Sequence, residues 1–202
     1  MILRILHYGD PILRAKGKPV ENIDNGIREL VANMIETMHA AHGVGLAAQQ
    51  IGESLQLTVL DVSAVEERPS MLKLDGTDLD PKTAMPLVLI NPEIELHGET
   101  EVGVEGCLSF PEITGDIERA QSVIVRAQTL EGGTIHIESS GFLARAIQHE
   151  CDHLNGILFI DRMRSAAKVA LSSRLRRLQK ETRRGTGIRP EEERPLVSET
   201  TL

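Results

Sequence analysis

A helix that carries the sequence HECDH at residues 149–153 has to place polar side chains inside the protein. The preceding apolar residues recur at helical spacing, which buries one side of this helix; they are Phe142, Leu143, Ala146 and Ile147. Residues four apart lie on the same side of a helix, so His149 and His153 can bind one metal ion. Glu150 lies beside them, where it can activate a water molecule. A chance HExxH on a surface helix is the alternative, but buried polar groups of this kind need a polar purpose.

The apolar spacing in the rest of the sequence predicts a series of strands flanked by helices. Apolar spacing predicts a helix over 26–41, and Ser139 and Ser140 are expected to cap the helix that carries HECDH. Segment 63–86, with three prolines and no clean period, is expected to be a surface insertion. Strands are predicted at 55–62, 86–96 (with an edge or bulge at Pro92), 101–105, 121–129 and 134–138. Because strands and helices do not alternate as βαβ units, the fold class is α+β.

Charge divides the chain into two unlike parts. Residues 1–161 hold 11 basic and 25 acidic residues, a net charge of -14, whereas residues 162–202 hold 11 basic and 5 acidic residues, a net charge of +6. Apolar residues form a narrow stripe among the arginines of 163–184, which predicts an amphipathic basic helix, and the last residues are expected to be disordered. Aromatic residues make up only 2% of the chain, so base stacking is not expected.

The two cysteines, Cys107 and Cys151, cannot form a disulfide scaffold in a chain of this length. The sequence has no signal-peptide pattern and no apolar run of membrane-spanning length, so we expect an intracellular, reduced protein with no membrane contact. Cysteine in such a protein is more often a metal ligand or a nucleophile than a bridge. On the predicted helix Cys151 points away from the two histidines.

A catalytic metal site needs a third protein ligand, and neither usual downstream pattern supplies one. In the pattern HExxHxxGxxH, the position of the third histidine is occupied by Phe159. In the pattern with a downstream glutamate, the expected position falls near Leu171. Cys107 is the best remaining candidate, although it could also be an inert buried cysteine or a nucleophile paired with His149. The other histidines also stay open as ligands; they are His7, His39, His42, His97 and His136.

Glycines in GVGLAAQQIG (43–52) imitate a dinucleotide-binding fingerprint, with Asp61 about where a ribose-binding acid would lie. A helix precedes this segment and no βαβ unit follows, so the context argues against that function. The alternative is that Gly45 lets a substrate backbone approach closely and that Gln50 directs its amide into the site.

Three segments together resemble the motifs of the peptide deformylases: GVGLAAQQIG, EGCLS (105–109) and QHECDHLNG (148–156), in this order and at this spacing. HYGDPILR near the start and INPEI at 90–94 extend the resemblance over roughly residues 1–165. The resemblance implies a compact α+β domain with antiparallel strands packed around a central metal-bearing helix. It also implies a hydrolase that removes the formyl group from the N-terminal methionine of new proteins and releases formate.

Carried over to this chain, the resemblance assigns Cys107, His149 and His153 as metal ligands and Glu150 as the general acid and base. It implies that Gln50 and the backbone N–H of Leu108 donate to the oxyanion. The divalent metal is expected to be Fe²⁺, with Zn²⁺, Ni²⁺ or Co²⁺ able to replace it, because a thiolate and two imidazoles suit several metals.

Substrate-binding residues follow in the same way. Val44, Gly45 and Gly106 are expected along the peptide site, and Val44 and Phe142 as walls of the methionine pocket. Arg145 departs from the pattern, because this position is apolar in some relatives. It either turns to solvent or gives the edge of the pocket a charge.

Partners and boundaries complete the prediction. We expect a catalytic domain over 1–165 and a basic helix with a disordered tail over 166–202, in a cytoplasmic protein that acts on formyl-methionyl nascent peptides and not on DNA. In some relatives a basic C-terminal helix contacts the ribosome, which makes 163–184 a candidate for ribosomal RNA contact. A solvated helix face or a dimer contact are alternatives, and a metallopeptidase or a non-catalytic peptide-binding module are the rival functions.

Overall fold

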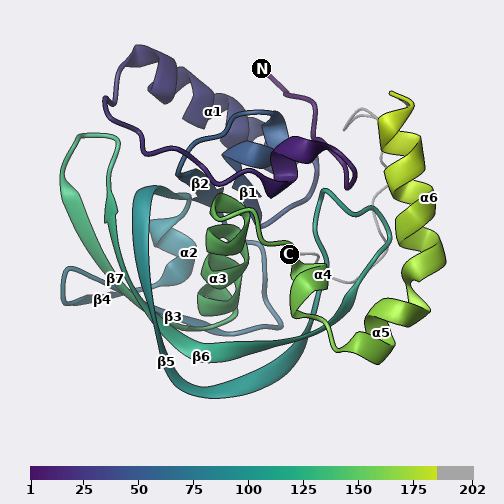
Figure 1. Ribbon diagram of the computed structural model, residues 1–202. Coiled ribbons are helices and arrows are strands. Elements are labelled where there is room, and N and C mark those ends of the chain that lie inside the picture. Colours follow the sequence, from purple (N-terminus) through teal and green to yellow (C-terminus); the bar gives the residue numbers. More distant parts are fainter. Residues whose placement is uncertain (186–202) are drawn as a thin grey trace.

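The computed structural model describes residues 1–185, and the expected disordered tail lies outside these residues. One seven-stranded antiparallel sheet bends around a single buried helix, α3 (Phe142–Leu154), as Figure 1 shows. The strand order is β1-β2-β5-β6-β7-β3-β4. The strands are β1 (Gly45–Ala47), β2 (Leu57–Leu60), β3 (Ser70–Leu74), β4 (Thr77–Leu79), β5 (Leu87–Glu105), β6 (Gly115–Gln128) and β7 (Thr134–Gly141). The α+β class and the antiparallel sheet are confirmed.

Helical elements surround the sheet. The helix predicted over 26–41 is confirmed as α1, and it begins at an Asp24 side chain that accepts a hydrogen bond from the Ile27 amide, an N-cap. The helical elements are the 3₁₀ helices η1 (Pro11–Arg14) and η2 (Ala48–Ile51), and the helices α1 (Asn25–Ala40), α2 (Pro81–Ala84), α4 (Phe159–Arg162), α5 (Ser165–Ala170) and α6 (Ser172–Arg183). Among residues 1–185, no helix combines the length and the apolar character that a bilayer crossing requires.

The two strands predicted at 86–96 and 101–105 form one long strand, β5. Its pairing with β6 shifts register between Ile90 and Glu93, around Pro92, and again between His97 and Thr100. Bulges of this kind bend a strand, and the bend lets β5 and β6 curve around α3. Burial alternates along most of β6, which directs Val123 and Val125 toward the core around α3 and Ile117 into the cluster with Phe110 and Phe159.

Segment 63–86 is not the surface excursion that its composition indicates. Within it β3 pairs with β7 and β4 pairs with β3, so the segment extends the main sheet by two strands. Leu72 is buried in the core beside α3. The pattern was obscured because the other residues of β3 and β4 stay partly or fully exposed.

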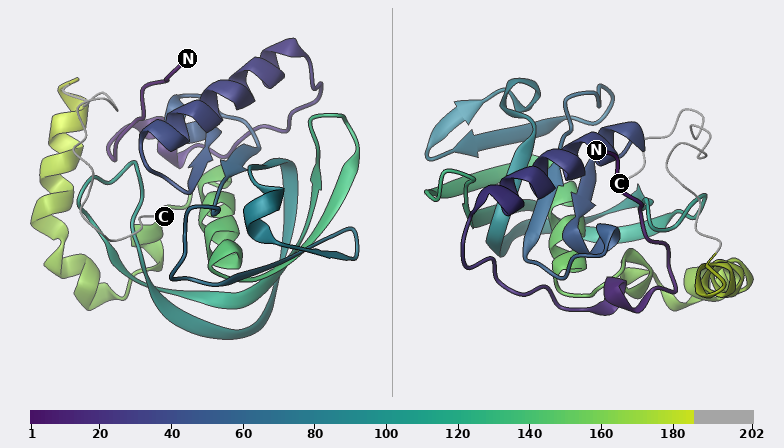
Figure 2. Two further views of the ribbon diagram at one scale, coloured as in Figure 1. Left: turned by 180° about the vertical axis from the view of Figure 1, so that it is seen from behind. Right: turned by 90° about the horizontal axis from the view of Figure 1, so that it is seen from above.

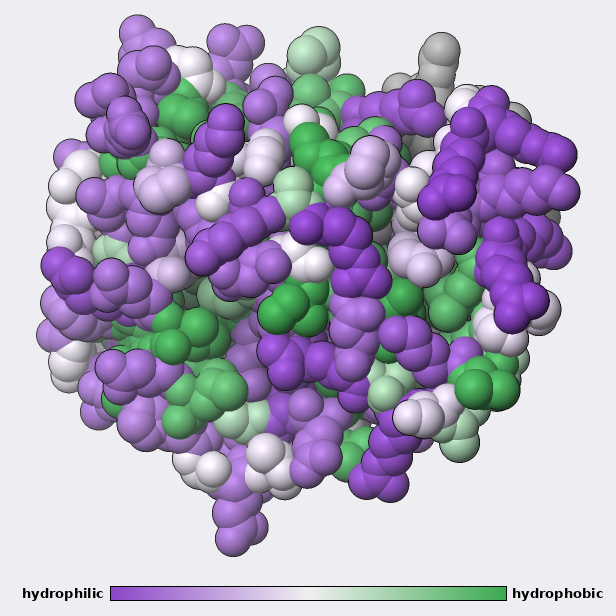
Figure 3. Space-filling model, in the orientation of Figure 1, coloured by the Kyte–Doolittle hydropathy of each residue, from purple (hydrophilic) through white to green (hydrophobic). Residues whose placement is uncertain are grey.

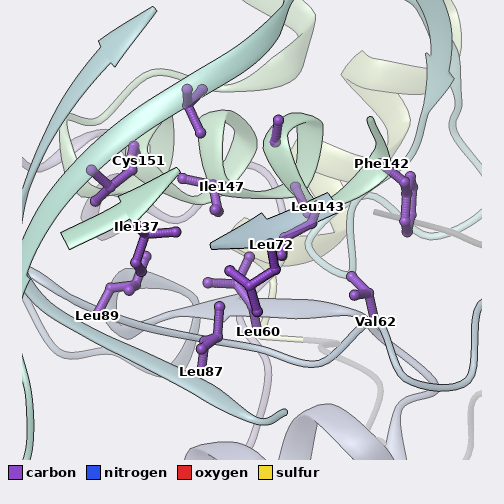
Figure 4. Close-up of a cluster of buried hydrophobic side chains, with 14 of the residues drawn as sticks. Leu60, Val62, Leu72, Leu87, Leu89, Ile137, Phe142, Leu143, Ile147 and Cys151 are labelled. Atoms are coloured by element: carbon purple, nitrogen blue, oxygen red, sulfur yellow. The ribbon is translucent and has the colours of Figure 1, made fainter. Parts of the chain in front are cut away.

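All thirteen residues of α3 are buried. Its apolar side packs against the sheet through Phe142, Leu143, Ile147 and Cys151 (Figure 4). Burying a leucine or phenylalanine side chain stabilises a fold by about 1.5–3 kcal/mol, so this contact holds the helix firmly in the bend of the sheet. The opposite side of α3 carries the polar residues, and each of them needs a partner inside the protein.

The expected serine caps of α3 are wrong. Ser139 and Ser140 belong to β7, because their pairing with β3 and β6 continues up to the helix. The helix begins instead after Gly141, at a φ of 72°, and the Ser70 hydroxyl of β3 accepts a hydrogen bond from the Leu143 amide. A Cβ on residue 141 would lie 2.3 Å from the Pro69 carbonyl oxygen, so the turn requires glycine.

The basic helix predicted over 163–184 is two helices, α5 and α6, joined at Leu171. Figure 2 shows, in its view from above, that α6 stands at the edge of the molecule, away from α1. Leu175 of α6 is buried in a cluster with Phe110 and Phe159, and Tyr8 stacks on Phe110 with ring centroids 4.9 Å apart. A pocket between η1 and α6 is lined by Tyr8, Gly9, Asp10, Pro11, Arg14, Leu158, Gln179 and Arg183.

Candidate metal centre and active site

The structure brings Cys107, His149 and His153 together. One ligand atom from each lies within 4.8 Å of the other two, and all three residues are buried. His149 and His153 come from successive turns of α3, as their spacing predicts, and Cys107 comes from the loop after β5. The Cys107 sulfur lies 3.2 Å from Nε2 of His153 and also neighbours His149, so the geometry offers a nucleophilic thiol either histidine as a partner.

The other histidines do not belong to this cluster. Among residues 1–185, the side chains whose ligand atoms come together in one group of three are those of Cys107, His149 and His153. Three of them form ion-pair contacts at the surface: His39 with Asp61, His97 with Glu95, and His136 with Asp75. Cys151 faces the apolar core, as expected, and burial raises the pKa of its thiol to about 12. Cys151 is therefore an inert core residue.

The donor set fits a divalent cation. Nε2 of His149 is buried and makes no hydrogen bond within residues 1–185. Burial acts against a charge on this ring, but the neighbouring Cys107 sulfur and the Glu105 carboxylate outweigh it and raise the pKa of His149 to about 10. Burial and the charge of His149 lower the pKa of His153 well below its usual value. The cluster thus attracts one positive charge, which a metal ion supplies when it displaces the proton.

Glu105 is a site residue that the sequence analysis missed. Its Oε2 lies 3.0 Å from Nδ1 of His149, and the side chain is fully buried. A carboxylate in this position fixes the orientation of a metal-binding imidazole. Burial would raise the pKa of Glu105, but His149 and Arg119 lower it below its ordinary value, so the carboxylate stays ionised. Its place directly before Gly106 and Cys107, at the end of a strand, was the available signal.

Glu150 lies beside the cluster and is buried. Burial raises the pKa of this carboxyl to about 7, even though His149 and Thr58 act in the opposite direction. The Thr58 hydroxyl lies 3.3 Å from Oε2 of Glu150 and 3.0 Å from the Leu46 carbonyl oxygen, and its one proton can serve either. An acid–base group with a pKa near 7 can both take up and release a proton at neutral pH.

Gly45 makes the space that Glu150 occupies. A Cβ on residue 45 would lie 2.2 Å from Oε1 of Glu150 and 2.7 Å from Cδ, closer than any side chain tolerates. Gly43 has a similar relation to Leu108, whose Cδ1 would lie 2.6 Å from an added Cβ. The glycines of the 43–52 segment therefore let β1 approach α3 and the Cys107 loop, as a close backbone contact requires.

Gln50 directs its amide toward the metal cluster. Its Oε1 accepts a hydrogen bond of 2.8 Å from the Ala47 amide, which orients the NH₂ group toward the Cys107 sulfur, 3.4 Å away, and the Ser109 hydroxyl, 3.2 Å away. The Leu108 backbone N–H makes no hydrogen bond within residues 1–185. Both donors thus lie beside Cys107.

The expected substrate residues are all buried. Gly106 directly precedes Cys107, and Val44 directly precedes the edge strand β1. Phe142 begins α3, and the Arg68 guanidinium lies 4.0 Å above its ring. Arg145 does not turn to solvent: it is 2% exposed and forms an ion pair with Glu105, which excludes the first of its two expected roles.

Known proteins with a similar sequence or fold share one family. The sequence profile of the polypeptide deformylase family matches residues 2–169. A curated peptide deformylase of Opitutus terrae is 45% identical over 193 residues, which cover 94% of this chain and 100% of that protein. The crystal structure of the Thermotoga maritima peptide deformylase has a TM-score of 0.69 at 42% identity and covers 81% of this chain and 99% of that one. A plant peptide deformylase structure has a TM-score of 0.78 at 36% identity, with 95% and 96% covered.

Proposed function

Because the chain belongs to the polypeptide deformylase family, it is a metal-dependent hydrolase that removes the N-formyl group of nascent proteins, and we propose which of its residues do so. Cys107, His149 and His153 hold the metal. The observation that carries this assignment is the buried convergence of one thiol and two imidazoles within 4.8 Å. Fe²⁺ is the metal we propose, with Zn²⁺, Ni²⁺ or Co²⁺ as substitutes, since a mixed sulfur and nitrogen site accepts each of them.

A divalent metal in this site supplies Lewis acidity, which makes water a stronger acid and a formyl carbonyl more electrophilic. Glu150 takes the proton of the attacking water and, when the C–N bond of the formamide breaks, delivers that proton to the departing amine. The Gln50 amide and the Leu108 N–H donate hydrogen bonds to the oxyanion. The products are formate and a free N-terminus: Glu150 carries one water proton to the nitrogen, and the second, released when formic acid ionises, goes to the new amine or to solvent.

The substrate peptide lies along the Val44–Gly45 segment in this proposal. Within residues 1–185, β1 stands at the edge of the sheet and pairs with β2 alone, so its other side can accept the backbone of an extended peptide. Gly106 leaves room beside Cys107 for the formyl group. Val44 and Phe142 form apolar walls for the methionine side chain, and Arg145 stands at the edge of that pocket.

Replacing Cys107 by serine tests the metal site. A hydroxyl is a much poorer ligand than a thiolate for these metals, so we expect the purified variant to contain less than a tenth of the metal of the parent and to release no measurable formate. Elemental analysis of both proteins measures the metal content, and an assay with formyl-Met-Ala-Ser measures formate release. Cys151→Ser is the matched control and should keep the metal. A Cys107→Ser protein with full metal content would contradict the assignment.

Contact of α5 and α6 with ribosomal RNA, in the cytoplasm, is the partner that we propose for the basic end of the chain. Hydrophilic side chains gather over α6 at the upper right of Figure 3. Five arginines on α6 and its end are exposed, as the hypothesis requires. Arg174 donates a hydrogen bond to the Glu112 carbonyl oxygen, and the other four are Arg176, Arg177, Arg183 and Arg184. Phosphate contacts of this kind need no aromatic side chains.

Neutralising these arginines is a better test than truncation, because Leu175 of α6 is buried in the core. Replacing the last four arginines by glutamine is expected to weaken co-sedimentation with ribosomes at low salt. It should also reduce the slope of log affinity against log salt by about 1 for each phosphate that is no longer bound. Formate release from a short peptide should stay unchanged. Unaltered co-sedimentation of a folded variant would leave α6 as a solvated helix face.

A further inference from the structure

The Glu105 carboxylate binds more cationic groups than its charge requires. Its Oε1 accepts hydrogen bonds of 2.9 Å from both Nε of Arg119 and Nη1 of Arg145. Its Oε2 accepts one of 3.0 Å from Nη2 of Arg119 and lies 3.0 Å from Nδ1 of His149. These four contacts use the lone-pair positions of the carboxylate. Arg119 alone, bound through two nitrogens, would neutralise Glu105 and orient its plane.

Arg145 is the second arginine, and it is completely enclosed. It lies one turn before His149 on α3, and its guanidinium also donates to the carbonyl oxygens of Ile117, at 3.0 Å, and Glu101, at 2.9 Å. An apolar side chain of similar volume would avoid the cost of removing a guanidinium from water. Stability alone therefore does not account for an arginine at this position.

Gly103 of β5 provides the space for this guanidinium. A Cβ on residue 103 would lie 2.9 Å from Cζ and 3.0 Å from Nη2 of Arg145. The guanidinium cannot move away easily, because Glu105, Ile117 and Glu101 hold it. Gly103 and Arg145 are thus complementary in size, and a larger residue at 103 would shift Arg145 away from Glu105.

The two arginines connect Glu105 to different elements. Arg119 connects it to β6 and, because its Nη1 also donates to Asp152, indirectly to the last turn of α3. Arg145 connects it directly to α3, one turn before His149. Oε1 and Oε2 of Glu105 are therefore both bound by α3, through residues one turn apart. Without Arg145, the direct contact that remains between the carboxylate and α3 is the one with His149, and the Arg119–Asp152 pair is an indirect link to a later turn. The terminal torsions of glutamate and histidine side chains are broad, so each needs such external contacts to stay in one orientation.

We propose that Arg145 is a positioning residue of the metal centre, which acts through Glu105 to hold the His149 ring with Nε2 directed at Cys107 and His153. Gly103 is the residue that permits it. This role is additional to a place at the edge of the methionine pocket, and it rests on the proposed metal site. Outer partners of metal ligands typically change metal affinity or activity about 10- to 100-fold when they are removed, and Arg145, which acts through one such partner, belongs at the lower end.

The experiment uses the full-length enzyme loaded with Co²⁺ and four variants: Arg145→Met, Arg145→Lys, Gly103→Ala and, as a matched control, Arg126→Met. Arg126 is an exposed arginine of β6 whose Nη1 lies 3.5 Å from Glu93. The readouts are the rate of Co²⁺ release to a chromophoric chelator, the visible absorption spectrum of the bound Co²⁺, and kcat and KM for formyl-Met-Ala-Ser. Circular dichroism establishes that each variant is folded.

Arg145→Met is expected to release Co²⁺ about tenfold faster than the parent, with a shifted Co²⁺ spectrum and a lower kcat at unchanged KM. Arg145→Lys should restore part of this loss, Gly103→Ala should resemble Arg145→Met, and Arg126→Met should match the parent. Release rate and spectrum identical to the parent in folded Arg145→Met would overturn the proposal. So would a change confined to KM, which would limit Arg145 to the pocket edge.

Gly103→Ala decides the question if Arg145→Met fails to fold, and parental release and spectrum in that variant would equally overturn the proposal. The Co²⁺ content of the parent enzyme distinguishes a failure of this inference from a failure of the proposed metal site. A parent enzyme that binds no stoichiometric Co²⁺ would refute the metal site itself.

Discussion

Glutamine in place of Glu150 is expected to lower kcat for formate release by about 100- to 10,000-fold, the usual contribution of a positioned general acid and base. The two side chains have the same shape, so the glutamine fits the space beside Gly45 and Thr58 without displacing the metal ligands. What is lost is the ability to accept and return a proton. The amide of glutamine does neither at neutral pH.

The measurement combines the rate of formate release with the metal content of the same preparation. The metal content of Glu150→Gln should equal that of the parent, which distinguishes a lost proton carrier from a lost ligand. Glu138→Gln is the matched control, because Glu138 is an exposed carboxylate of β7. A fully active Glu150→Gln enzyme would assign proton transfer to another group.

Alanine at Gly45 is expected to lower kcat by about 100-fold, the cost of misplacing a catalytic group by roughly 1 Å. The added Cβ would lie 2.2 Å from Oε1 of Glu150, and the buried carboxyl has to move away from it. The three atoms nearest to this Cβ all belong to Glu150, so metal content should be preserved. The variant thus tests the position of the Glu150 carboxyl while leaving its ability to exchange a proton unchanged.

Steady-state kinetics of formate release and metal analysis measure this effect, with Gly133→Ala as the control. A Cβ at 133 would lie 3.6 Å from the Thr129 hydroxyl, an ordinary contact, in the turn between β6 and β7. In the Glu150→Gln background, Gly45→Ala should add little further loss, because both changes act on one group. Independent, multiplicative losses would show that Gly45 acts on the substrate instead.

The central helix and its two histidines could be predicted from the sequence because the geometry between residues 149 and 153 is local. Cys107 could be proposed by exclusion and by resemblance, and the structure places it beside them. These features depend on short segments whose residue types allow few other arrangements.

Long-range packing accounts for what could not be predicted. Glu105 reaches His149 across 44 residues, and nothing local to either residue indicates the contact. Arg145 of α3 can be buried because Gly103, in strand β5, has no side chain. The start of α3 depends on Ser70, which lies in a segment without a clear strand pattern.

Tyr8 gives this enzyme a built-in optical reporter. The chain has no tryptophan, one tyrosine and three phenylalanines, which emit only weakly, so its tyrosine emission comes from Tyr8 alone. Tyr8 stacks on Phe110 and lines the pocket between η1 and α6. Emission and its anisotropy therefore report on whether α6 stays seated. They can follow the packing of α6 in the purified protein without a dye, a fusion or any substitution in the chain.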